Sequence, residues 1–346
     1  MLGLAHSKIA LKSRSLGQTS ISLTEIGFGT APLGNLYKEV GEDEASAALG
    51  AAWQSGIRYF DTAPYYGFGL SERRVGDITR NLEGLVLSTK VGRLLVPDQK
   101  HRGTALRHGF CSPLPFKPEF DYSYDAIMRS YETSLVRLGQ AKIDILLVHD
   151  LGELTHGQEH QRHFRDFETG GYRALEELRS SGDIKAIGLG VNEYEICEQV
   201  MDVGQFDCFL LAGRYTLLEQ GALMSFMPKC QAHGASLIIG GAYNSGILAT
   251  GVRSSAKLHY NYETPPPEIV KQVASIEDIC DAYKVPIAAA ALQFPLHHEL
   301  VTSVIPGVES AKRVKQTMAL YETNIPSQLW ADLKSEGLLH SEAPTP

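Results

Sequence analysis

The 346-residue chain lacks the features that mark several classes of protein. No apolar run approaches the roughly 18 residues that a membrane-spanning helix needs, so we expect no membrane span. The formal net charge is −8 and the chain has no basic stripe, which argues against a nucleic-acid partner. The first five residues are too short for the apolar core of a signal peptide, and Lys8, Lys12 and Arg14 follow them closely.

Cysteine is scarce, and no two cysteines form a CxxC pair. The five are Cys111, Cys197, Cys208, Cys230 and Cys280. An odd number of scattered cysteines indicates buried thiols in a reducing compartment. We therefore predict a cytoplasmic protein without a metal site.

Short apolar segments alternate with helical patterns along most of the chain. The predicted strands are residues 25–30, 58–60, 85–90, 143–148, 184–190, 208–212, 236–239 and 302–305. Runs such as Ile145-Leu146-Leu147-Val148 are typical of parallel strands covered on both faces. Eight such units predict an α/β fold, a (β/α)8 TIM barrel in one domain over residues 1–346. A doubly wound sheet is the alternative, but no GxGxxG opens its first turn.

Extra segments flank and interrupt this alternation. We predict a β-hairpin over residues 9–24 that closes the floor of the barrel. We also predict a C-terminal helix and tail over residues 327–346. Residues 91–120 predict a long irregular loop, because three prolines fall between Pro113 and Pro118. Residues 151–171 predict a second loop. With the 251–265 segment, these long βα loops are the predicted pocket walls.

Polar residues stand where successive predicted strands end. Asp61, Lys90, His149 and Asn192 occupy these positions, and Tyr66 follows Asp61 in a glycine-rich turn. The strand ends of a barrel meet at one mouth. A nearby lysine lowers the pKa of a phenol from about 10, and a histidine can orient a substrate oxygen. The group predicts proton transfer at an alcohol or carbonyl oxygen. Singly, each residue also suits a structural role, such as a helix cap or a core histidine.

Four motifs in order resemble the aldo-keto reductase family over nearly the whole chain. They are Arg14-Ser15-Leu16-Gly17 with Ile26-Gly27-Phe28-Gly29-Thr30, Phe60-Asp61-Thr62-Ala63 with Tyr66-Gly67 and Ser71-Glu72, Ser88-Thr89-Lys90-Val91-Gly92, and Leu147-Val148-His149. The resemblance implies a barrel oxidoreductase that uses NAD or NADP. It also implies that Asp61, Tyr66, Lys90 and His149 are its catalytic residues.

The same resemblance implies the cofactor contacts. Asn192 matches an asparagine that binds the nicotinamide amide, and Tyr243 matches an aromatic residue that stacks on the ring. Further implied contacts are Thr30, Asp61, Ser245, Gly246, Ile305, Gly307, Glu309, Arg313 and Thr317. Gly307 replaces a lysine that many NADP-dependent members have, and Glu309 would repel a 2′-phosphate. NAD is therefore the favoured cofactor.

Within the family, several blocks resemble a branch that contains D-threo-aldose (L-fucose) 1-dehydrogenases and pyridoxal 4-dehydrogenase. They include Asp121-Tyr122-Ser123-Tyr124-Asp125 and Tyr243-Asn244-Ser245-Gly246-Ile247-Leu248. This branch implies NAD(P)-dependent oxidation of an aldose at C1 to the lactone, with Tyr66 as base. Pyridoxal oxidation and NADPH-dependent reduction of aldehydes or ketones are the alternatives.

Two readings from other classes stay open. His156, His160 and His163 have a spacing that could place three imidazoles on one helical face, as in a metal-dependent barrel hydrolase. We instead predict a solvated loop there, because Gly157 disfavours a helix. A non-catalytic, nicotinamide-binding barrel subunit is the second reading. A small-molecule sugar or aldehyde is the expected partner, and the chain is expected to be a monomer or a small homo-oligomer.

Overall fold

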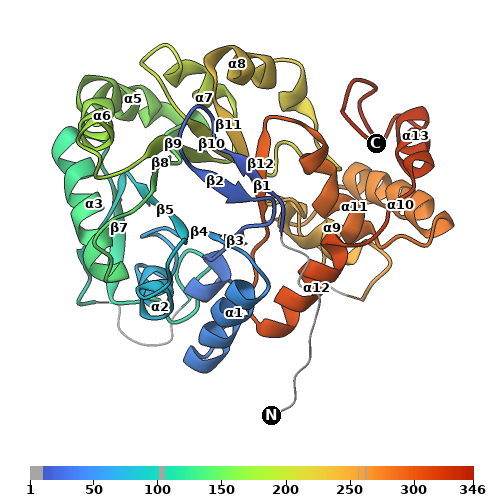
Figure 1. The fold of residues 1–346 in the computed structure, drawn as a ribbon, viewed down its shortest axis with the longest axis horizontal. Helices are drawn as coiled ribbons and strands as arrows, with labels where there is room; N and C mark the ends of the chain where they lie inside the picture. The colour runs from blue at the N-terminus through green and yellow to red at the C-terminus, as the bar shows by residue number, and fades with distance from the viewer. Residues whose placement is uncertain (1–10, 101–105, 256, 262) are drawn as a thin grey trace.

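Eight parallel strands form a closed ring in the computed structural model, which describes residues 11–100, 106–255, 257–261 and 263–346 (Figure 1). In order around the sheet they are β12 (Val301–Ile305), β11 (Ser236–Gly240), β10 (Cys208–Ala212), β9 (Ala186–Val191), β8 (Ile145–His149), β5 (Val86–Val91), β4 (Tyr59–Asp61) and β3 (Phe28–Gly29). Parallel bridges from Ile26 to Val304 and from Gly29 to Gly307 join the two ends. The predicted (β/α)8 barrel is confirmed, and the strand ends lie within two or three residues of prediction.

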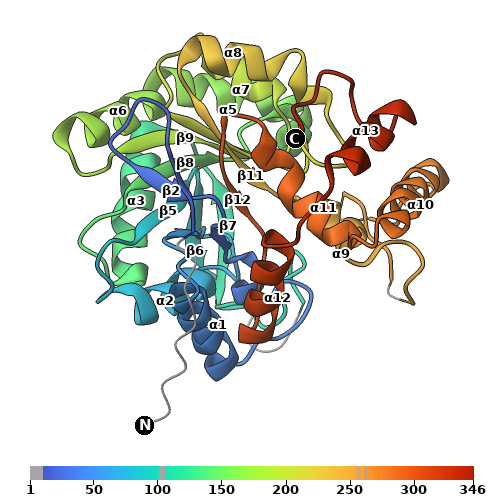
Figure 2. The same ribbon diagram turned by 45° about the vertical axis from the view of Figure 1, so that its right-hand side comes forward.

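Helices surround this ring on its outer side, as Figures 1 and 2 show. They include α1 (Glu42–Gln54), α2 (Leu70–Thr79), α3 (Tyr124–Leu138), α6 (Tyr172–Ser181), α7 (Glu195–Val200), α8 (Phe226–His233), α9 (Ile247–Thr250), α10 (Pro267–Ala282), α11 (Ile287–Gln293), α12 (Ala311–Tyr321) and α13 (Ser327–Ser335). In α1, acidic residues fill the first turn, where they interact favourably with the helix dipole. Its buried residues Ala45, Ala48, Leu49 and Ala52 form one apolar stripe that faces the core.

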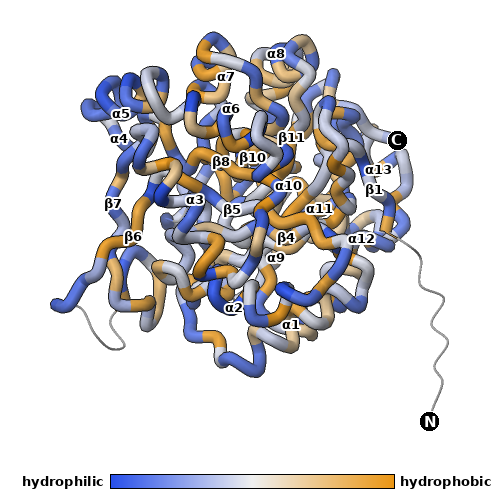
Figure 3. The backbone as a smooth tube through the Cα atoms, turned by 60° about the vertical axis from the view of Figure 1, so that its left-hand side comes forward, coloured by the Kyte–Doolittle hydropathy of each residue, from blue (hydrophilic) through white to orange (hydrophobic). Residues whose placement is uncertain are grey.

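The hydrophobic residues concentrate on the strands, while helices such as α5 (His160–Asp166) consist largely of hydrophilic residues (Figure 3). No helix in the described part of the chain combines the length and apolar character that crossing a membrane requires. The expected buried thiols are confirmed for Cys197, Cys208, Cys230 and Cys280, but Cys111 is only partly buried.

An antiparallel hairpin closes one end of the barrel. Strands β1 (Ser13–Ser15) and β2 (Ser22–Thr24) lie in front of the ring in Figure 1. Leu16, Ile21 and Leu23 are buried and join the apolar cluster that fills the barrel interior. The turn requires glycine at Gly17, which has a φ of 52° and where a Cβ would lie 2.6 Å from the Asp207 carbonyl oxygen. The predicted hairpin is confirmed, apart from residues 9–10, which lie outside the described residues.

The prediction of an irregular loop over residues 91–120 was wrong for two segments. Strands β6 (Arg93–Pro97) and β7 (Phe116–Phe120) form an antiparallel ribbon, with Arg93 paired to Phe120 and Pro97 to Phe116. Prolines suggested a loop. A two-stranded ribbon has two open edges, however, and a proline that faces an open edge removes no hydrogen bond from the ladder.

The prediction of a loop over residues 151–171 was also wrong. The chain there forms α4 (Glu153–His156), a short 3-10 turn, α5 and a π-helical turn (Phe167–Gly171) that runs into α6. Glycines at four positions lowered the expected helix propensity. Tertiary packing outweighs that propensity, because Phe167 is fully buried and Tyr172 packs against Phe206.

Candidate active site

The carboxyl ends of three neighbouring strands bring the predicted catalytic residues together. Asp61 ends β4, Lys90 lies near the end of β5, and His149 ends β8. A cavity of about 500 Å³ opens at this mouth of the barrel and is lined by Tyr66, Lys90, His149 and Asn192, among others. The predicted convergence of these side chains is therefore found.

Lys90 is buried at the base of the cavity and its ammonium group is fully hydrogen-bonded. Nζ donates to Asp61 Oδ2 at 2.7 Å and to the Thr62 carbonyl oxygen at 2.9 Å, and it is also hydrogen-bonded to Tyr66. Gly190 of β9 leaves room for the lysine, since a Cβ there would lie 2.9 Å from Lys90 Cε. Burial lowers the pKa of Lys90, but Asp61 and Tyr66 raise it by more, so the net shift is upward. Lys90 is thus a cation at neutral pH.

A chain of hydroxyl groups holds the second oxygen of Asp61. Ser88 Oγ donates to Asp61 Oδ1 at 2.7 Å and lies 2.9 Å from the Tyr59 hydroxyl. Burial, with the Asp61 carboxylate, raises the pKa of Tyr59 well above its usual value, so this phenol stays protonated. Sequence analysis missed both residues. The available signal was strand alternation, which places Ser88 on the face of Lys90 and Tyr59 on the face of Asp61.

His149 is buried beside Tyr66, with the two rings nearly perpendicular and their centroids 6.0 Å apart. Burial, followed by the charges of Arg93 and Lys90, lowers the pKa of His149 well below its usual value. The imidazole is therefore neutral at physiological pH. Its Nδ1 has no hydrogen-bond partner among the described residues. A neutral histidine can orient a substrate oxygen without adding a charge.

A buried ion pair that the sequence analysis did not predict lines the same cavity. Arg93 of β6 is paired with Asp150, which directly follows His149. The Arg93 guanidinium lies 4.1 Å over the Tyr65 ring and 4.8 Å over the Phe120 ring. We missed Arg93 because it lies in the segment that we predicted to be irregular.

The predicted cofactor residues fall into two groups, one near the catalytic residues and one on the rim. Thr30 is buried, and its Oγ1 donates to the Asp61 carbonyl oxygen at 2.8 Å, so it braces the backbone there. Asn192 lines the cavity, and its Nδ2 lies 3.4 Å from Asp150 Oδ1. Ile305 is buried at the end of β12. Thr30 and Asn192 therefore lie beside the catalytic residues, and Ile305 belongs to the apolar cluster of the barrel interior.

The rim group comes from the segments that follow β11 and β12. Ser245 and Gly246 belong to a 3-10 turn after β11 (Asn244–Gly246), while Gly307, Glu309, Arg313 and Thr317 lie after β12 or on α12. Burial raises the pKa of Tyr243 above its usual value, and the charge of Arg313 opposes this shift in part. Glu309 forms ion pairs with Lys38, at 3.1 Å, and with Arg313, at 3.8 Å.

These residues fit a nicotinamide dinucleotide. The Tyr243 hydroxyl is buried and has no hydrogen-bond partner in the described part of the chain. Helix α12 begins with Ser310 as its cap, and Arg313 is exposed in its first turn. A helix N-terminus with exposed cations suits a phosphate group. Asn192 and Tyr243 would hold the nicotinamide end, and the rim residues the adenosine end.

The three histidines of the hydrolase reading do not form a metal centre. Among the residues that the structure describes, no group of three or more potential ligands could hold a metal ion. The His156 and His163 rings lie 4.2 Å apart, but His156 Nε2 is hydrogen-bonded to the Tyr122 hydroxyl and His160 Nδ1 lies 3.2 Å from the Leu151 carbonyl oxygen. The predicted solvated loop was also wrong, because His160 and His163 are buried.

Comparison with known proteins agrees with the barrel and its site. The Aldo/keto reductase family profile matches residues 25–336, so the chain belongs to this family of nicotinamide-dependent oxidoreductases. A pyridoxal 4-dehydrogenase of Microbacterium luteolum is 45% identical over 95% of this chain and 98% of the relative. A D-threo-aldose 1-dehydrogenase of a Pseudomonas species is 37% identical over 94% and 96%.

Solved structures support the same fold. An aldo-keto reductase from Bacillus halodurans, in its holo form, matches with a TM-score of 0.73 and 23% identity, over 94% of this chain and 96% of that one. A glycerol dehydrogenase from Gluconobacter oxydans matches with the same TM-score and 19% identity, over 96% and 97%. At these identities the structural likeness bears on the fold alone.

Proposed function

We propose that this protein oxidises a cyclic hemiacetal to a lactone, with an aldose of the L-fucose or D-threo type oxidised at C1 as the first candidate substrate. The observation that carries the proposal is the buried Lys90, held between Asp61 and Tyr66 at the edge of the cavity. The relatives at 45% and 37% identity are both dehydrogenases, which supports the oxidative direction.

In the proposed mechanism, bound NAD or NADP would supply the hydride acceptor for the carbon that bears the hydroxyl group. Tyr66, as phenolate, removes the proton of that hydroxyl group. The Lys90 cation favours the phenolate form, and Asp61 keeps the cation in place. Neutral His149 orients the substrate oxygen. In the reverse direction the Tyr66 phenol returns its proton to a carbonyl oxygen.

Cofactor contacts are proposed for Thr30, Asp61, Asn192, Tyr243, Ser245, Gly246, Ile305, Gly307, Glu309, Arg313 and Thr317. NAD is favoured over NADP for two reasons. Gly307 brings no cation to the rim, and Glu309 already takes up the charge of Lys38. A carboxylate at this position repels a 2′-phosphate and accepts a hydrogen bond from a ribose hydroxyl group.

Pyridoxal is the second candidate substrate, because the relative that is 45% identical is a pyridoxal 4-dehydrogenase. Its hemiacetal form would undergo the same oxidation. Carbonyl reduction with NADPH uses the same four residues in reverse. A non-catalytic nicotinamide-binding subunit is disfavoured, because the proposed catalytic residues are present and assembled.

The test is an absorbance assay for reduced nicotinamide at alkaline pH, with NAD or NADP and a panel of aldoses plus pyridoxal. We expect turnover of L-fucose-like aldoses and a higher kcat/KM with NAD. Turnover of pyridoxal alone would assign the second candidate. Cofactor binding without oxidation of any of these substrates would contradict the proposal and favour a reductase or a binding subunit.

A further inference from the structure

The alternation of side chains along a strand does not by itself explain why Asp150 of the Arg93–Asp150 pair faces the cavity. Successive side chains of a strand point to opposite faces, so a residue that follows an inward His149 should face the surrounding helices. Asp150 instead has a φ of 47°, and its N–H donates to the Gly190 carbonyl oxygen at 3.0 Å. This left-handed turn, which aspartate tolerates better than most residues, lets His149 and Asp150 line the same cavity.

The pair is nearly inaccessible, with 6% of Arg93 and 8% of Asp150 exposed. Removing two charges from water costs several kcal/mol, which a hydrophobic replacement would avoid. Burial raises the pKa of Asp150, while Arg93 and then Lys90 lower it. Because a buried ion pair is costly, its presence at the wall of a substrate cavity points to a role in substrate binding.

Hydrogen-bonding capacity in the pair is unused. Arg93 Nε has no partner in the described residues, and Asp150 Oδ1 has only the 3.4 Å contact from Asn192. Asp150 Oδ2 lies 3.6 Å from His149 Nε2. His149, which is proposed to contact the reacting oxygen, thus lies beside Asp150, which has unused acceptor capacity. This arrangement suits a substrate that carries two hydroxyl groups close together. Tyr65 and Phe110, whose rings lie 5.4 Å apart, supply an apolar wall beside them.

We propose that Arg93 and Asp150 form a specificity subsite for a substrate hydroxyl group close to the carbon that is oxidised. In an aldose this is the hydroxyl group at C2, which would donate to Asp150 and accept from Arg93. In pyridoxal it is the ring hydroxyl group, which lies one carbon further from the oxidised carbon than the C2 hydroxyl group of an aldose does. The inference rests on the proposed hemiacetal oxidation and specifies which substrates that reaction takes.

A site built to hydrogen-bond a substrate hydroxyl group rejects an analogue without it, because the buried partners are then left unpaired. The test compares L-fucose with its 2-deoxy analogue, and pyridoxal with 3-deoxypyridoxal, in the wild type and in Asp150→Asn and Arg93→Gln. We expect the wild type to prefer the hydroxylated member by roughly 100-fold or more in kcat/KM. Either substitution should reduce this ratio to below about 10-fold, mostly by slowing the hydroxylated member.

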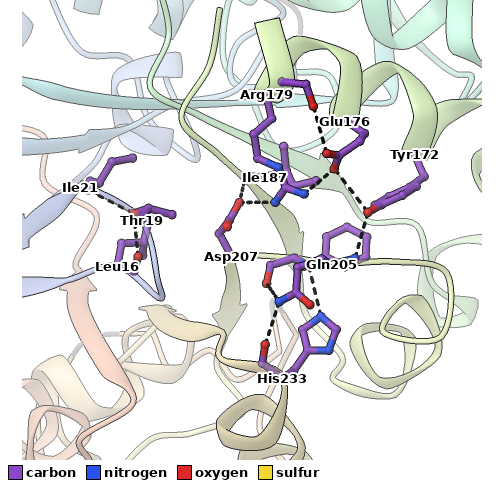
Figure 4. A network of polar contacts seen from close by, with 12 residues as sticks. Leu16, Thr19, Ile21, Tyr172, Glu176, Arg179, Ile187, Gln205, Asp207 and His233 are labelled. Carbon is purple, nitrogen blue, oxygen red and sulfur yellow. Dashed lines mark hydrogen bonds and ion pairs between the residues drawn. The ribbon is translucent and has the colours of Figure 1, made fainter. Parts of the chain in front are cut away.

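The matched control is Asp207→Asn. Asp207 also pairs with an arginine, Arg179, at 2.7 Å, and accepts from the Ile187 N–H at 2.9 Å, but this network lies beside the hairpin at the opposite end of the barrel (Figure 4). We expect Asp207→Asn to lower the stability of the protein and to leave its preference for the hydroxylated substrates unchanged. If Asp150→Asn lowers kcat/KM equally for a hydroxylated substrate and for its deoxy analogue, Asp150 only positions His149. That result would overturn the subsite.

The outcomes separate this inference from the proposed function. If the wild type turns over a hydroxylated substrate and its deoxy analogue equally well, the subsite is overturned but the proposed oxidation is still supported. Absence of any turnover contradicts the proposed function. In that case the melting temperature tests the subsite. If L-fucose or pyridoxal raises the melting temperature of the wild type, and the rise is lost with the deoxy analogue and in Asp150→Asn, the subsite is supported. If there is no such difference, the subsite is overturned.

Discussion

Lys90 Nζ lies 2.7 Å from Asp61 Oδ2, and each residue is only 2% exposed. This ion pair joins neighbouring strands of the barrel, β4 and β5, at the carboxyl end of β4. Lys90 also donates to the Thr62 carbonyl oxygen, and Ser88 donates to Asp61, so neither charge is left uncompensated. The pair therefore both stabilises the mouth of the barrel and fixes a cation beside Tyr66.

Replacing Lys90 tests both roles. In Lys90→Met, Asp61 becomes an unpaired buried carboxylate, so we expect the free energy of unfolding to fall by about 3–5 kcal/mol. Without the cation, the Tyr66 phenolate forms at higher pH, so the alkaline rise of kcat/KM for oxidation should shift upward. Urea unfolding and a pH–rate profile measure the two effects. Lys185→Met, which removes a partly exposed lysine paired with Asp144 at 3.0 Å, is the control and should leave the profile unchanged.

Removing the Tyr66 hydroxyl group should abolish proton transfer and leave the fold intact. We expect Tyr66→Phe to lower kcat for oxidation by about 10²- to 10⁴-fold, the usual contribution of a general base. Cofactor binding, followed by quenching of protein fluorescence, should persist. Tyr124→Phe removes an exposed hydroxyl group that bonds Glu177 and should retain activity. Near-normal turnover by Tyr66→Phe would remove Tyr66 from the mechanism.

Position 307 should set the cofactor preference. A Cβ at Gly307 would lie 3.0 Å from Pro32 Cγ, so a side chain there needs only a small adjustment. We expect Gly307→Lys to raise the NADP-to-NAD ratio of kcat/KM by about tenfold, because it adds a cation for the 2′-phosphate. Thr133→Lys, which adds the same charge on an exposed site of α3, is the control. An unchanged ratio in Gly307→Lys would place the phosphate site elsewhere.

The stability of the protein should fall in mild acid. Burial, and then the charge of His163, lowers the pKa of His156 to about 4 from the usual 6.5. Between these values the unfolded chain binds a proton that the folded protein does not. The stability that depends on this histidine is therefore complete above about pH 6.5 and decreases as the pH falls toward 4. Urea unfolding at pH 7 and 4.5 should show a smaller pH dependence for His156→Gln, whereas the exposed control His340→Gln should match the wild type.

The hairpin should contribute to stability without taking part in the reaction. Leu23 is fully buried in the cluster that fills the barrel interior. Leu23→Ala should lower the free energy of unfolding by about 2–5 kcal/mol, as cavities in cores do, with little change in kcat. Val136→Ala, on an exposed site of α3, should cost far less. A strong loss of kcat in a folded Leu23→Ala would link the barrel floor to the active site.

Much of the proposed catalytic site could be predicted from single residues at strand ends. Asp61 and His149 each directly follow a short apolar run, and Lys90 comes after one with Ser88 and Thr89 between. A parallel barrel must bring the carboxyl ends of its strands to one mouth. Local patterns therefore determined both the fold and the convergence of these side chains. The same reasoning placed the hairpin under the barrel, where Leu16 and Leu23 are buried.

Only the tertiary structure decided the features that depend on distant contacts. Arg93 and Asp150 are 57 residues apart in the chain, and the ribbon that positions Arg93 contains the prolines that predict a loop. The helical path of residues 153–171 likewise depends on packing around Phe167, which outweighs the glycines beside it. The sequence by itself determined which residues end the strands, because that is a local property. Which other side chains meet them in the cavity depends on long-range packing, which no local pattern records.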